Sequence, residues 1–436
     1  MAGEWTPINL GDVCTKIGSG ATPRGGSDVY LESGPFTLIR SQNVYNDGFH
    51  HDGLAYIGEK QAAELDGVEV LKGDVLLNIT GDSVARACEV DPGVLPARVN
   101  QHVAIIRPDP EKLHPRFLRY FLVSPEMQVK LLSWAGSGGT RNALTKGMIE
   151  SFDVLAPEDI DEQRAIAHIL GTLDDKIELN RRMSETLAAM ARALFKSWFV
   201  DFDPVHAKAE GRDPGLPQPL ADLFPARLID SELGEIPDGW EVKSLDEIAR
   251  FLNGLALQKY PPADGRSLPV IKIAQLRAGN TSGADRASAD LDPDYLVNDG
   301  DILFSWSGSL ECVLWAGGPG ALNQHLFKVT SSDYPRWLCY LGVHVHLEDF
   351  RHIAAGKATT MGHIQRHHLS DAKIAVPQVP VPAAIDAQLS PIVESIWKRE
   401  VESRTLSALR DALLPRLISG ELRVDDAERF IAGVDA

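Results

Sequence analysis

The sequence has few cysteines and no long apolar run. Its 436 residues include four cysteines, which are scattered and form no Cys-x-x-Cys pair, so we expect neither a disulfide framework nor a zinc site. No run of about eighteen apolar residues occurs, which disfavours a transmembrane helix. The opening residues, MAGEWTPINLGD, lack the basic and apolar segments of a signal peptide. These absences predict a cytoplasmic protein with reduced thiols.

Positive charge is also scarce. The chain has 43 Lys and Arg against 61 Asp and Glu, a net charge of −18. Proteins that bind nucleic acid usually present a basic face, so the composition by itself disfavours this class. A DNA-binding face remains possible only if cations are gathered in particular loops.

Signatures of catalysis and of metal binding are missing as well. The Gly-rich stretch at 17–26, IGSGATPRGG, lacks the Gly-Lys-Ser/Thr ending of a phosphate-binding loop and the preceding strand of a dinucleotide-binding turn. PDGWEVK at 237–243 resembles a nuclease signature, but two intervening residues cannot bring both carboxylates to one metal. His363 and His367 have the i, i+4 spacing of helical metal ligands, without an obvious third ligand. We therefore expect no metal site, no cofactor and no catalytic activity.

What the sequence does contain is an internal repeat. Asn-Gln-His occurs at 100–102 and again at 323–325, and its neighbours recur in the same order. Trp5 and Trp240 are 235 residues apart, GDVLLNITGD and GDILFSWSGS are 227 apart, and Asn-Gln-His recurs after 223. The offset then falls to 220 and stays at 219 to the end of the pattern. A steadily falling and then constant offset indicates two copies of one module that differ in loop length.

Each copy begins with a strand-rich region. Short runs rich in β-branched residues, such as DVLLNIT and DILFSWS, are bounded by Gly, Asp and Pro. The Asn-Gln-His triplets precede such runs, where a hydrogen-bonding role in the fold is favoured over a contact with a base. We predict two mixed, strand-rich domains of about 140–155 residues.

Each copy ends in a long helix. From Ile166 onward apolar residues follow alternating steps of four and three, which is a heptad seam, and the pattern returns 219 residues later with polar residues in the middle of both seams. Two such seams predict an antiparallel coiled coil, whereas the simpler alternative is two surface helices on separate domains. The seam residues are Ile166, Leu170, Leu173, Ile177, Leu187, Leu194 and Trp198 in the first helix, and Ile385, Leu389, Ile392, Ile396, Leu406, Leu413 and Leu417 in the second.

The sequence thus predicts an α+β protein with an internal pseudo-two-fold repeat. A segment rich in Pro, Asp and Gly between the halves predicts a linker that follows the surface. The predicted parts are a first strand-rich domain at 1–155, a central helix at 156–205, the linker at 206–235, a second strand-rich domain at 236–380, and a distal helix with its tail at 381–436.

This arrangement resembles the specificity subunit of type I restriction-modification enzymes. The resemblance lies in the paired Trp openings, the Gly-Asp-Val/Ile-Leu and Asn-Gln-His strands, and the two long helices. It is strengthened by the segments 162–180 and 194–205, and by the Ser-Glu-Leu-Gly-Glu-Ile-Pro-Asp-Gly-Trp stretch. The second copy departs from the pattern, because Val-Pro-Ala at 381–383 replaces the Glu-Gln pair of the first.

The resemblance implies a non-catalytic subunit. Two target-recognition domains would each read one half of a split double-stranded DNA sequence, and the paired helices would separate them and dock two methyltransferase subunits. Restriction subunits, which carry the motor and the nuclease, would join through these. The methyl donor and ATP would bind to the partner subunits. A coiled-coil scaffold that binds no DNA is the rival class, which the acidic charge slightly favours.

Polar residues in loops and at strand ends are the candidates for DNA contacts. Arg and Lys suit guanine edges, Asn and Gln suit adenine, and Ser, Thr and Lys anchor phosphates. The candidates in the first domain are Arg24, Arg40, Gln42, Asn43, Arg98, Arg141 and Asn142. Those in the second are Lys259, Lys272, Gln275, Arg277, Lys357, Thr359 and Arg366.

The length of the seams also predicts the spacing of the target. About 33 helical residues span roughly 48 Å, so we expect half-site centres about one turn of DNA, or about 10 base pairs, apart.

Overall fold

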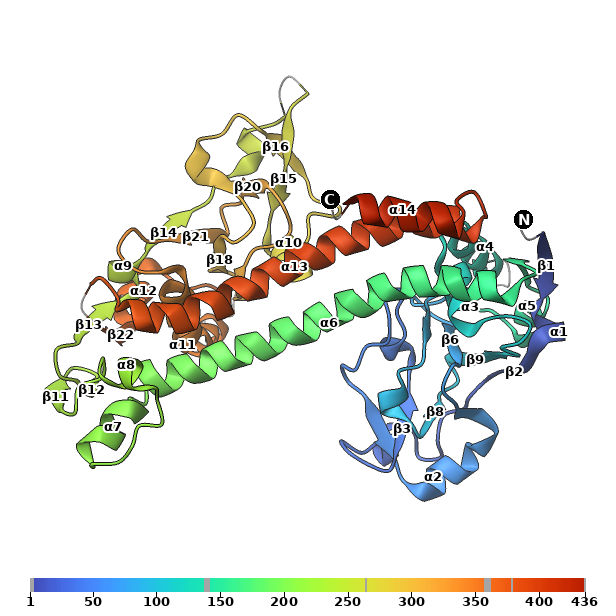
Figure 1. Ribbon diagram of the computed structural model, residues 1–436, viewed down its shortest axis with the longest axis horizontal. Helices are drawn as coiled ribbons and strands as arrows, with labels where there is room; N and C mark the ends of the chain where they lie inside the picture. The colour runs from blue at the N-terminus through green and yellow to red at the C-terminus, as the bar shows by residue number, and fades with distance from the viewer. Residues whose placement is uncertain (1–3, 137–141, 263–264, 357–361, 378, 435–436) are drawn as a thin grey trace. The chain divides into compact units, whose positions relative to one another are not determined.

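The structure is a computed structural model that describes residues 4–136, 142–262, 265–356, 362–377 and 379–434. The chain divides into two compact units, residues 1–176 with 406–436 (unit 1) and residues 177–405 (unit 2). Both boundaries lie inside long helices, α6 (Ile160–Phe199) and α13 (Ala383–Ile418). Each unit therefore combines one strand-rich domain with part of each helix (Figure 1).

Unit 1 contains two four-stranded sheets and a two-stranded ribbon. The first sheet is antiparallel in the order β2-β9-β6-β7, and the second has the order β4-β3-β8-β5, in which β3 and β8 are parallel. The ribbon pairs β1 with β10. The strands are β1 (Trp5–Asn9), β2 (Cys14–Ser19), β3 (Phe36–Ile39), β4 (Ala55–Ile57), β5 (Glu69–Val70), β6 (Val75–Asn78), β7 (Ala87–Glu89), β8 (Ala97–Val99), β9 (Val103–Pro108) and β10 (Asp153–Pro157).

Unit 2 repeats this topology strand for strand. Its antiparallel sheet has the order β14-β21-β18-β19, its mixed sheet the order β16-β15-β20-β17 with β15 parallel to β20, and its ribbon pairs β13 with β22. This match confirms the predicted duplication. The strands are β13 (Glu241–Ser244), β14 (Arg250–Asn253), β15 (Ser267–Ile271), β16 (Arg286–Ser288), β17 (Leu296–Val297), β18 (Ile302–Ser305), β19 (Cys312–Leu314), β20 (Gly320–Leu322), β21 (Leu326–Thr330) and β22 (Lys373–Val376).

The central strands of the two antiparallel sheets are buried on both faces. All four residues of β6 and all four of β18 are buried, which explains why these strands read as continuous apolar runs instead of alternating ones. One face packs against a helix that the sequence also repeats. It begins PRFLRYFLV at 115–123 in unit 1 and PRWLCYLGV at 335–343 in unit 2, 220 residues apart.

Helices complete both units. In unit 1 they are α1 (Leu10–Val13), α2 (Glu59–Glu64), α3 (Pro115–Val123), α4 (Pro125–Gly136), α5 (Lys146–Glu150) and α14 (Val424–Val434). In unit 2 they are α7 (Asp203–Ala209), α8 (Gln218–Ala221), α9 (Leu245–Ile248), α10 (Ile273–Ala278), α11 (Arg336–Ala355) and α12 (Arg366–Asp371). No helix among the described residues is long and apolar enough to cross a membrane.

The helices α6 and α13 pair antiparallel in each unit, as the heptad pattern predicts. In unit 1 the early α6 residues Ile166 and Leu170 share a core with Leu413 and Leu417, near the end of α13. In unit 2 the last turns of α6 share a core with residues of α13 near its start, such as Leu389. Figure 1 shows α6 in green and α13 in orange-red. The alternative of two separate surface helices is therefore wrong.

The segment after α6 is more ordered than the predicted surface linker. It forms α7, α8 and a hairpin of β11 (Leu228–Ser231) and β12 (Gly234–Pro237). Val205, Leu220 and Phe224 are buried in the core of unit 2, and Phe224 meets Trp198 at a ring distance of 5.8 Å. Apolar residues scattered among Pro, Gly and Asp therefore anchor the segment, although they produce no periodicity.

Candidate nucleic-acid interface

The two units place a cation at the same corner of the mixed sheet. Arg40 follows β3 and Lys272 follows β15, and each precedes a short helix. The third residue of that helix caps the turn, because the backbone N–H of Arg40 donates to Asn43 Oδ1 at 3.1 Å and that of Lys272 donates to Gln275 Oε1 at 3.3 Å. Two different sequences, RSQN and KIAQ, therefore build one corner with a cation at its start.

Both cations already have protein partners. The Arg40 guanidinium donates to the Gly53 carbonyl at 2.5 Å and lies over the Tyr30 ring at 5.4 Å. Its buried Nε has no hydrogen-bond partner in the described chain. Lys272 Nζ pairs with Asp285 at 2.5 Å. A ligand could reach either cation in exchange for its present partner, since Arg40 is partly exposed and Lys272 is exposed.

Two of the predicted DNA-binding residues do not fit this role. Arg98 is 4% exposed and donates to Asp66 at 2.9 Å and to the Ala62 and Ala97 carbonyls. Asn43 is 0% exposed, and its Nδ2 donates to the carbonyls of His50 and Asp52 in addition to the cap described above. Their polar atoms are used inside the domain, so they organise the fold instead of facing a duplex.

The remaining predicted residues lie at the surface or outside the described part. Gln42 is exposed and donates to the Gly53 carbonyl at 3.1 Å, and Arg366 donates to the Phe251 carbonyl at 3.2 Å. Gln275 is half-buried, and its side-chain oxygen accepts the capping hydrogen bond from Lys272 N–H. Four further candidates are exposed and make no side-chain hydrogen bond within the described ranges: Arg24, Asn142, Lys259 and Arg277. Arg141, Lys357 and Thr359 lie outside the described residues.

The Asn-Gln-His triplets form the turns next to the cation corners. Asn100 donates its backbone N–H to the Ile39 carbonyl, directly before Arg40, and Asn323 does the same to Ile271, directly before Lys272. Both asparagines are 5% exposed, and each side chain accepts the backbone N–H of the histidine two residues later, at 3.0 and 3.4 Å. The predicted fold-holding role of these asparagines is confirmed.

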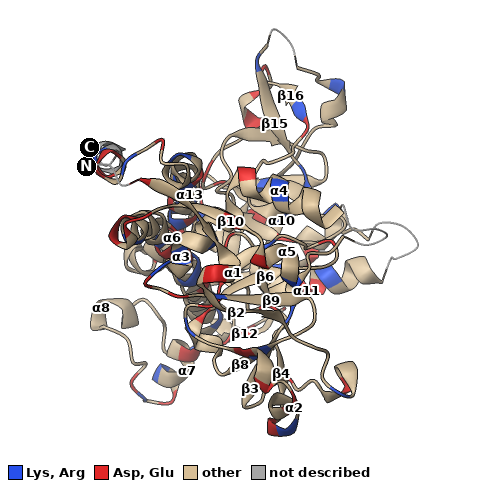
Figure 2. Ribbon diagram, turned by 90° about the vertical axis from the view of Figure 1, so that its right-hand side faces the viewer, with Lys and Arg blue, Asp and Glu red and all other residues tan. Residues whose placement is uncertain are grey.

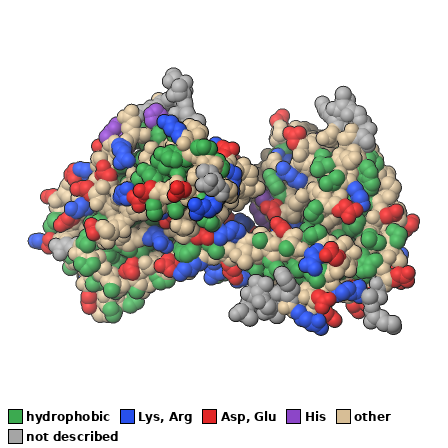
Figure 3. All heavy atoms as spheres, turned by 90° about the horizontal axis from the view of Figure 1, so that it is seen from above, with side chains coloured by type: hydrophobic (Ala, Val, Ile, Leu, Met, Phe, Trp, Pro, Cys, Tyr) green, Lys and Arg blue, Asp and Glu red, His purple; other side chains and the backbone are tan. Residues whose placement is uncertain are grey.

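The charge around these corners is mixed. Figure 2 shows Lys and Arg interspersed with Asp and Glu along the helices and strands. The face drawn in Figure 3 likewise alternates blue and red among green apolar side chains. Because charges of both signs are mixed on the faces drawn, any contact with DNA must depend on local groups more than on a broad positive field.

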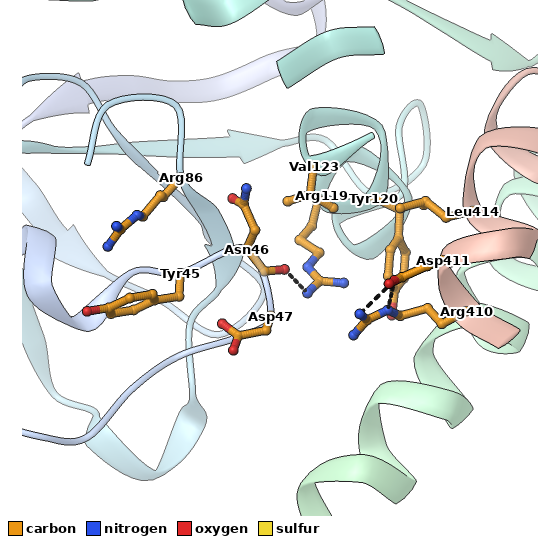
Figure 4. A pocket seen from close by; sticks show the side chains of 10 residues that line it. All are labelled: Tyr45, Asn46, Asp47, Arg86, Arg119, Tyr120, Val123, Arg410, Asp411 and Leu414. Atoms are coloured by element: carbon orange, nitrogen blue, oxygen red, sulfur yellow. Dashed lines mark hydrogen bonds and ion pairs between the residues drawn. The ribbon is translucent and has the colours of Figure 1, made fainter. Parts of the chain in front are cut away.

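A hollow of about 360 Å³ in unit 1 contains arginines that the sequence analysis missed. It lies between the loop after β3, α3 and the last turns of α13 (Figure 4). The Arg86 guanidinium stacks on Tyr45 at 4.5 Å, and Arg119 donates to the Asn46 carbonyl at 2.7 Å. The sequence did contain a signal for Arg119. In the aligned stretches PRFLRY and PRWLCY, Arg119 of the first copy is replaced by Cys339 in the second.

Asp174 of α6 forms the centre of the charges beside this hollow. Arg119 and Arg410 approach it at 2.7 and 2.8 Å, and the Tyr120 hydroxyl donates to it at 2.7 Å. Burial alone would raise the pKa of Asp174, but Arg119 and the hydrogen bonds from Arg410 and Tyr120 outweigh burial and hold this pKa below its ordinary value. One carboxylate thus ties α3 to both long helices in unit 1.

The histidine pair considered as a metal site does not have the required geometry. His363 precedes α12 and His367 lies inside it, so the two are not one turn apart on a helix. Across the described ranges, no three His, Cys, Asp or Glu side chains are grouped in a way that could hold a metal ion.

The predicted seam residues are distributed over two cores. Those of the first helix are buried from Ile166 to Leu173 and half-buried at Ile177, Leu187 and Leu194, with Trp198 buried again. Those of the second are half-buried at Ile392 and Leu406 and buried at Ile396, Leu413 and Leu417. These residues pack within the described chain, so their expected role in binding partners stays a prediction.

Comparison with known proteins shows which family the chain matches. A family model described as the type I restriction modification DNA specificity domain matches residues 2–189 and 237–396. The type I restriction enzyme HindI specificity subunit of Haemophilus influenzae is 25% identical over 96% of this chain and 100% of its own. The MjaIX specificity subunit of Methanocaldococcus jannaschii is 27% identical over 70% of this chain and 69% of its own.

A solved structure agrees at the level of fold. The S subunit of a type I restriction-modification system from M. genitalium has a TM-score of 0.55 at 14% identity, covering 95% of this chain and 96% of that one.

Proposed function

The chain belongs to the family of type I restriction modification DNA specificity proteins, and we propose that its two strand-rich domains each read one half of a split DNA target. The observation that carries this proposal is the exact repetition of strand order with different polar residues at equivalent corners. Arg40 with Gln42 stands in one domain where Lys272 with Ala274 stands in the other. A shared frame with different side chains suits two readers of different sequences.

The paired helices are the proposed docking surface for two methyltransferase subunits, through which restriction subunits join. An internal repeat presents two equivalent surfaces, which is what two identical partners require. Apolar residues of α6 support this role, since Leu179 and Met190 are 50% and 48% exposed. The chain itself would be non-catalytic and free of cofactors, with the methyl donor and ATP bound by the partner subunits.

A domain exchange tests the proposal. Residues 1–155 are replaced by the equivalent domain of a relative with a different target, and the methylated sequence is mapped in cells that carry the complete system. We expect one half of the methylated motif to change and the other half to persist. A change in both halves, or in neither, contradicts modular reading.

The rival function, a scaffold that binds no DNA, is tested by titration. The complex with its methyltransferase subunits is titrated with random duplex at low and at moderate salt. A DNA reader loses affinity with a slope of several units in log–log form. A scaffold shows no binding at either salt concentration.

We also propose that the helices determine the gap between the half-sites. Four residues inserted after Asn180 lengthen α6 by about 6 Å and rotate the following turn by about 40°. The expected result is a gap longer by one or two base pairs, or loss of binding. An unchanged motif with an unchanged gap would show that the helices do not control the spacing.

A further inference from the structure

The two units share a chain of polar side chains that the reading of bases does not explain. In unit 1, Gln101 Nε2 lies 2.9 Å from His102 Nε2, and His102 Nδ1 lies 2.5 Å from the Thr80 hydroxyl. In unit 2 the corresponding distances are 3.3 Å from Gln324 to His325 and 3.1 Å from His325 to the Ser307 hydroxyl. We call each of these sets of glutamine, histidine and hydroxyl a relay.

The hydrogen bonds assign the direction of each relay. An amide Nε2 can only donate, so the histidine Nε2 must accept and the ring proton must be on Nδ1. In unit 1 the Thr22 hydroxyl also donates to Gln101 Oε1 at 2.7 Å. Nδ1–H then donates to the hydroxyl oxygen, which in unit 1 leaves the hydroxyl proton of Thr80 available to another acceptor. The second amide hydrogen of the glutamine is available as well.

The backbone holds both relays rigidly. A Cβ on Gly20 would lie 1.7 Å from the Val99 carbonyl oxygen, and one on Gly254 would lie 2.3 Å from that of Asn323. Glycine at these two positions lets the strands β2 and β14 run directly against the Asn-Gln-His turns. Gly20 N–H donates to the Asn100 carbonyl at 3.1 Å, and Gln324 N–H donates to the Leu255 carbonyl at 2.9 Å. The donors are therefore preorganised before any ligand arrives.

The glutamines of the relays are accessible and lie beside the cation corners. Gln101 is exposed, and Gln324, His102 and His325 are half-buried, whereas Ser307 of the second relay is 3% exposed. In each mixed sheet the cation and the relay follow two parallel strands, β3 and β8 in unit 1 and β15 and β20 in unit 2. Both therefore lie at the same end of these strands. A duplex engaged by Arg40 or Lys272 would therefore pass close to the adjacent relay.

We propose that each relay binds a phosphate of the DNA backbone. This inference rests on the proposed function, and it concerns which part of the DNA is contacted. The bases differ between the two half-sites, whereas the phosphodiester is common to both, so a constellation that is repeated in both domains fits the common part. Neutral amide and hydroxyl donors are frequent phosphate ligands, and they suit a chain whose net charge is −18.

The first test measures binding by the complex with its methyltransferase subunits. Gln101→Ala and Gln324→Ala are compared with the wild type on the cognate duplex and on a random duplex. We expect each variant to bind both duplexes more weakly by the same factor. The expected loss of affinity is about three- to tenfold, which corresponds to one hydrogen bond. The methylated motif and the salt slope should be unchanged, because no charge is removed.

Two control variants sharpen this measurement. Gln218→Ala removes an exposed amide of α8, outside both corners, and should leave binding unchanged. His102→Asn should weaken binding as Gln101→Ala does, and the double variant should be no weaker than either single one, because the residues act as a unit. Thermal melting of each variant confirms that the fold is retained.

The second test identifies the phosphate. Uncharged methylphosphonates replace the phosphates of each half-site one at a time, and affinities are measured for the wild type and for Gln101→Ala. A methylphosphonate at one position of the first half-site should lower the affinity of the wild type. The same methylphosphonate should not lower the affinity of Gln101→Ala any further. Gln324→Ala should behave in the same way in the second half-site.

The outcomes separate this inference from the proposed function. Loss of all salt-dependent binding by the wild-type complex would contradict the function itself. Normal wild-type binding with unaltered Gln101→Ala and Gln324→Ala variants overturns the relay alone. A change in the methylated motif of either variant would assign the relay to base reading, which also overturns the inference.

Discussion

The two units have the same strand order but hold their helices by different chemistry. In unit 1 the contact between α3 and the long helices is ionic, with Asp174 between Arg119 and Arg410. The equivalent residues of unit 2 are Val393, Cys339 and Ala191, all buried among apolar neighbours. The repeat therefore preserved the position of the contact and not its physical nature.

Aromatic packing replaces the charges in unit 2. Trp337 of α11 meets Phe195 at a ring distance of 6.3 Å and Phe199 at 5.5 Å, and these two rings stack at 4.7 Å. Leu414 and Ile418 stand at the positions of Phe195 and Phe199 in unit 1. The carboxylate at the centre of an ion network titrates, whereas aromatic rings do not, so the two units should respond differently to substitution and to pH.

The largest expected effect is the loss of an aromatic anchor. Trp337→Ala should lower the free energy of unfolding of unit 2 by about 3–5 kcal/mol, because it leaves a large cavity and removes the hydrogen bond from Trp337 Nε1 to Asp386. Phe117→Ala is the matched change in unit 1 and should cost less, because Phe117 has no such bond. Denaturant unfolding followed by tryptophan fluorescence measures both, and equal losses would contradict the aromatic account of unit 2.

The ionic network gives the next largest effect. Asp174→Asn should cost roughly 2–4 kcal/mol, because it leaves the buried guanidinium of Arg119 without its counter-charge and Arg410 with Asp411 alone. The triple variant Asp174→Val, Arg119→Cys, Arg410→Ala installs the residues of unit 2 and should be more stable than the single variant, since apolar replacement of a whole buried network is often nearly neutral. A triple variant less stable than Asp174→Asn would show that the network itself stabilises unit 1.

The pH dependence should distinguish the units. In unit 2, burial together with Arg192 lowers the pKa of His344 to about 4, although its hydrogen bond to the Cys312 carbonyl opposes this. The unfolded chain then binds a proton that the folded chain does not, so the contribution of His344 is complete above about pH 6.5 and is lost as the pH decreases toward 4, by about 1.4 kcal/mol per pH unit. His344→Gln should flatten this part of the profile.

Asp174 of unit 1 should respond to acid at a lower pH than His344. Its pKa in the folded state is depressed, so its contribution is present above the pKa of an unfolded aspartate, about 3.9, and is lost as the pH falls below that value. Unfolding curves measured between pH 3 and 8 would show the two regimes. If the Asp174→Asn variant lost stability below about pH 3.9 as the wild type does, the attribution of this loss to Asp174 would be contradicted.

The smallest expected effect concerns the polar middle of the helix pair. Asn180 is 1% exposed and donates to Glu402 at 2.9 Å, while Arg399 donates to Asn180 Oδ1 at 3.4 Å. Asn180→Ala should cost about 1–2 kcal/mol, because it removes both of these hydrogen bonds. Ser184→Ala, which loses a bond to the Ile396 carbonyl at 3.3 Å, is the matched control and should cost less. Differential scanning calorimetry of both variants would establish the order.

Parts of the candidate site could be predicted from local patterns. Arg40 and Lys272 follow strands that the apolar runs indicate, and a cation at the end of a strand is exposed unless the chain returns to cover it. The fold-holding role of Asn100 followed from its position before a strand. Arg98 has the same local pattern, but Asp66 lies 32 residues earlier and meets it inside the domain, and nothing near Arg98 in the sequence indicates that contact.

The sequence alone determined the duplication, the strand-rich halves and the paired helices, because these depend on periodicity and on the order of landmarks. Only the tertiary structure decided which polar side chains make hydrogen bonds or ion pairs inside the fold. Asp174 and Arg410 are 236 residues apart and make one ion pair, and the relays join residues 22 and 18 positions apart. Burial of a polar group depends on a partner that the folded chain supplies from a distance, and a local pattern carries no record of that partner.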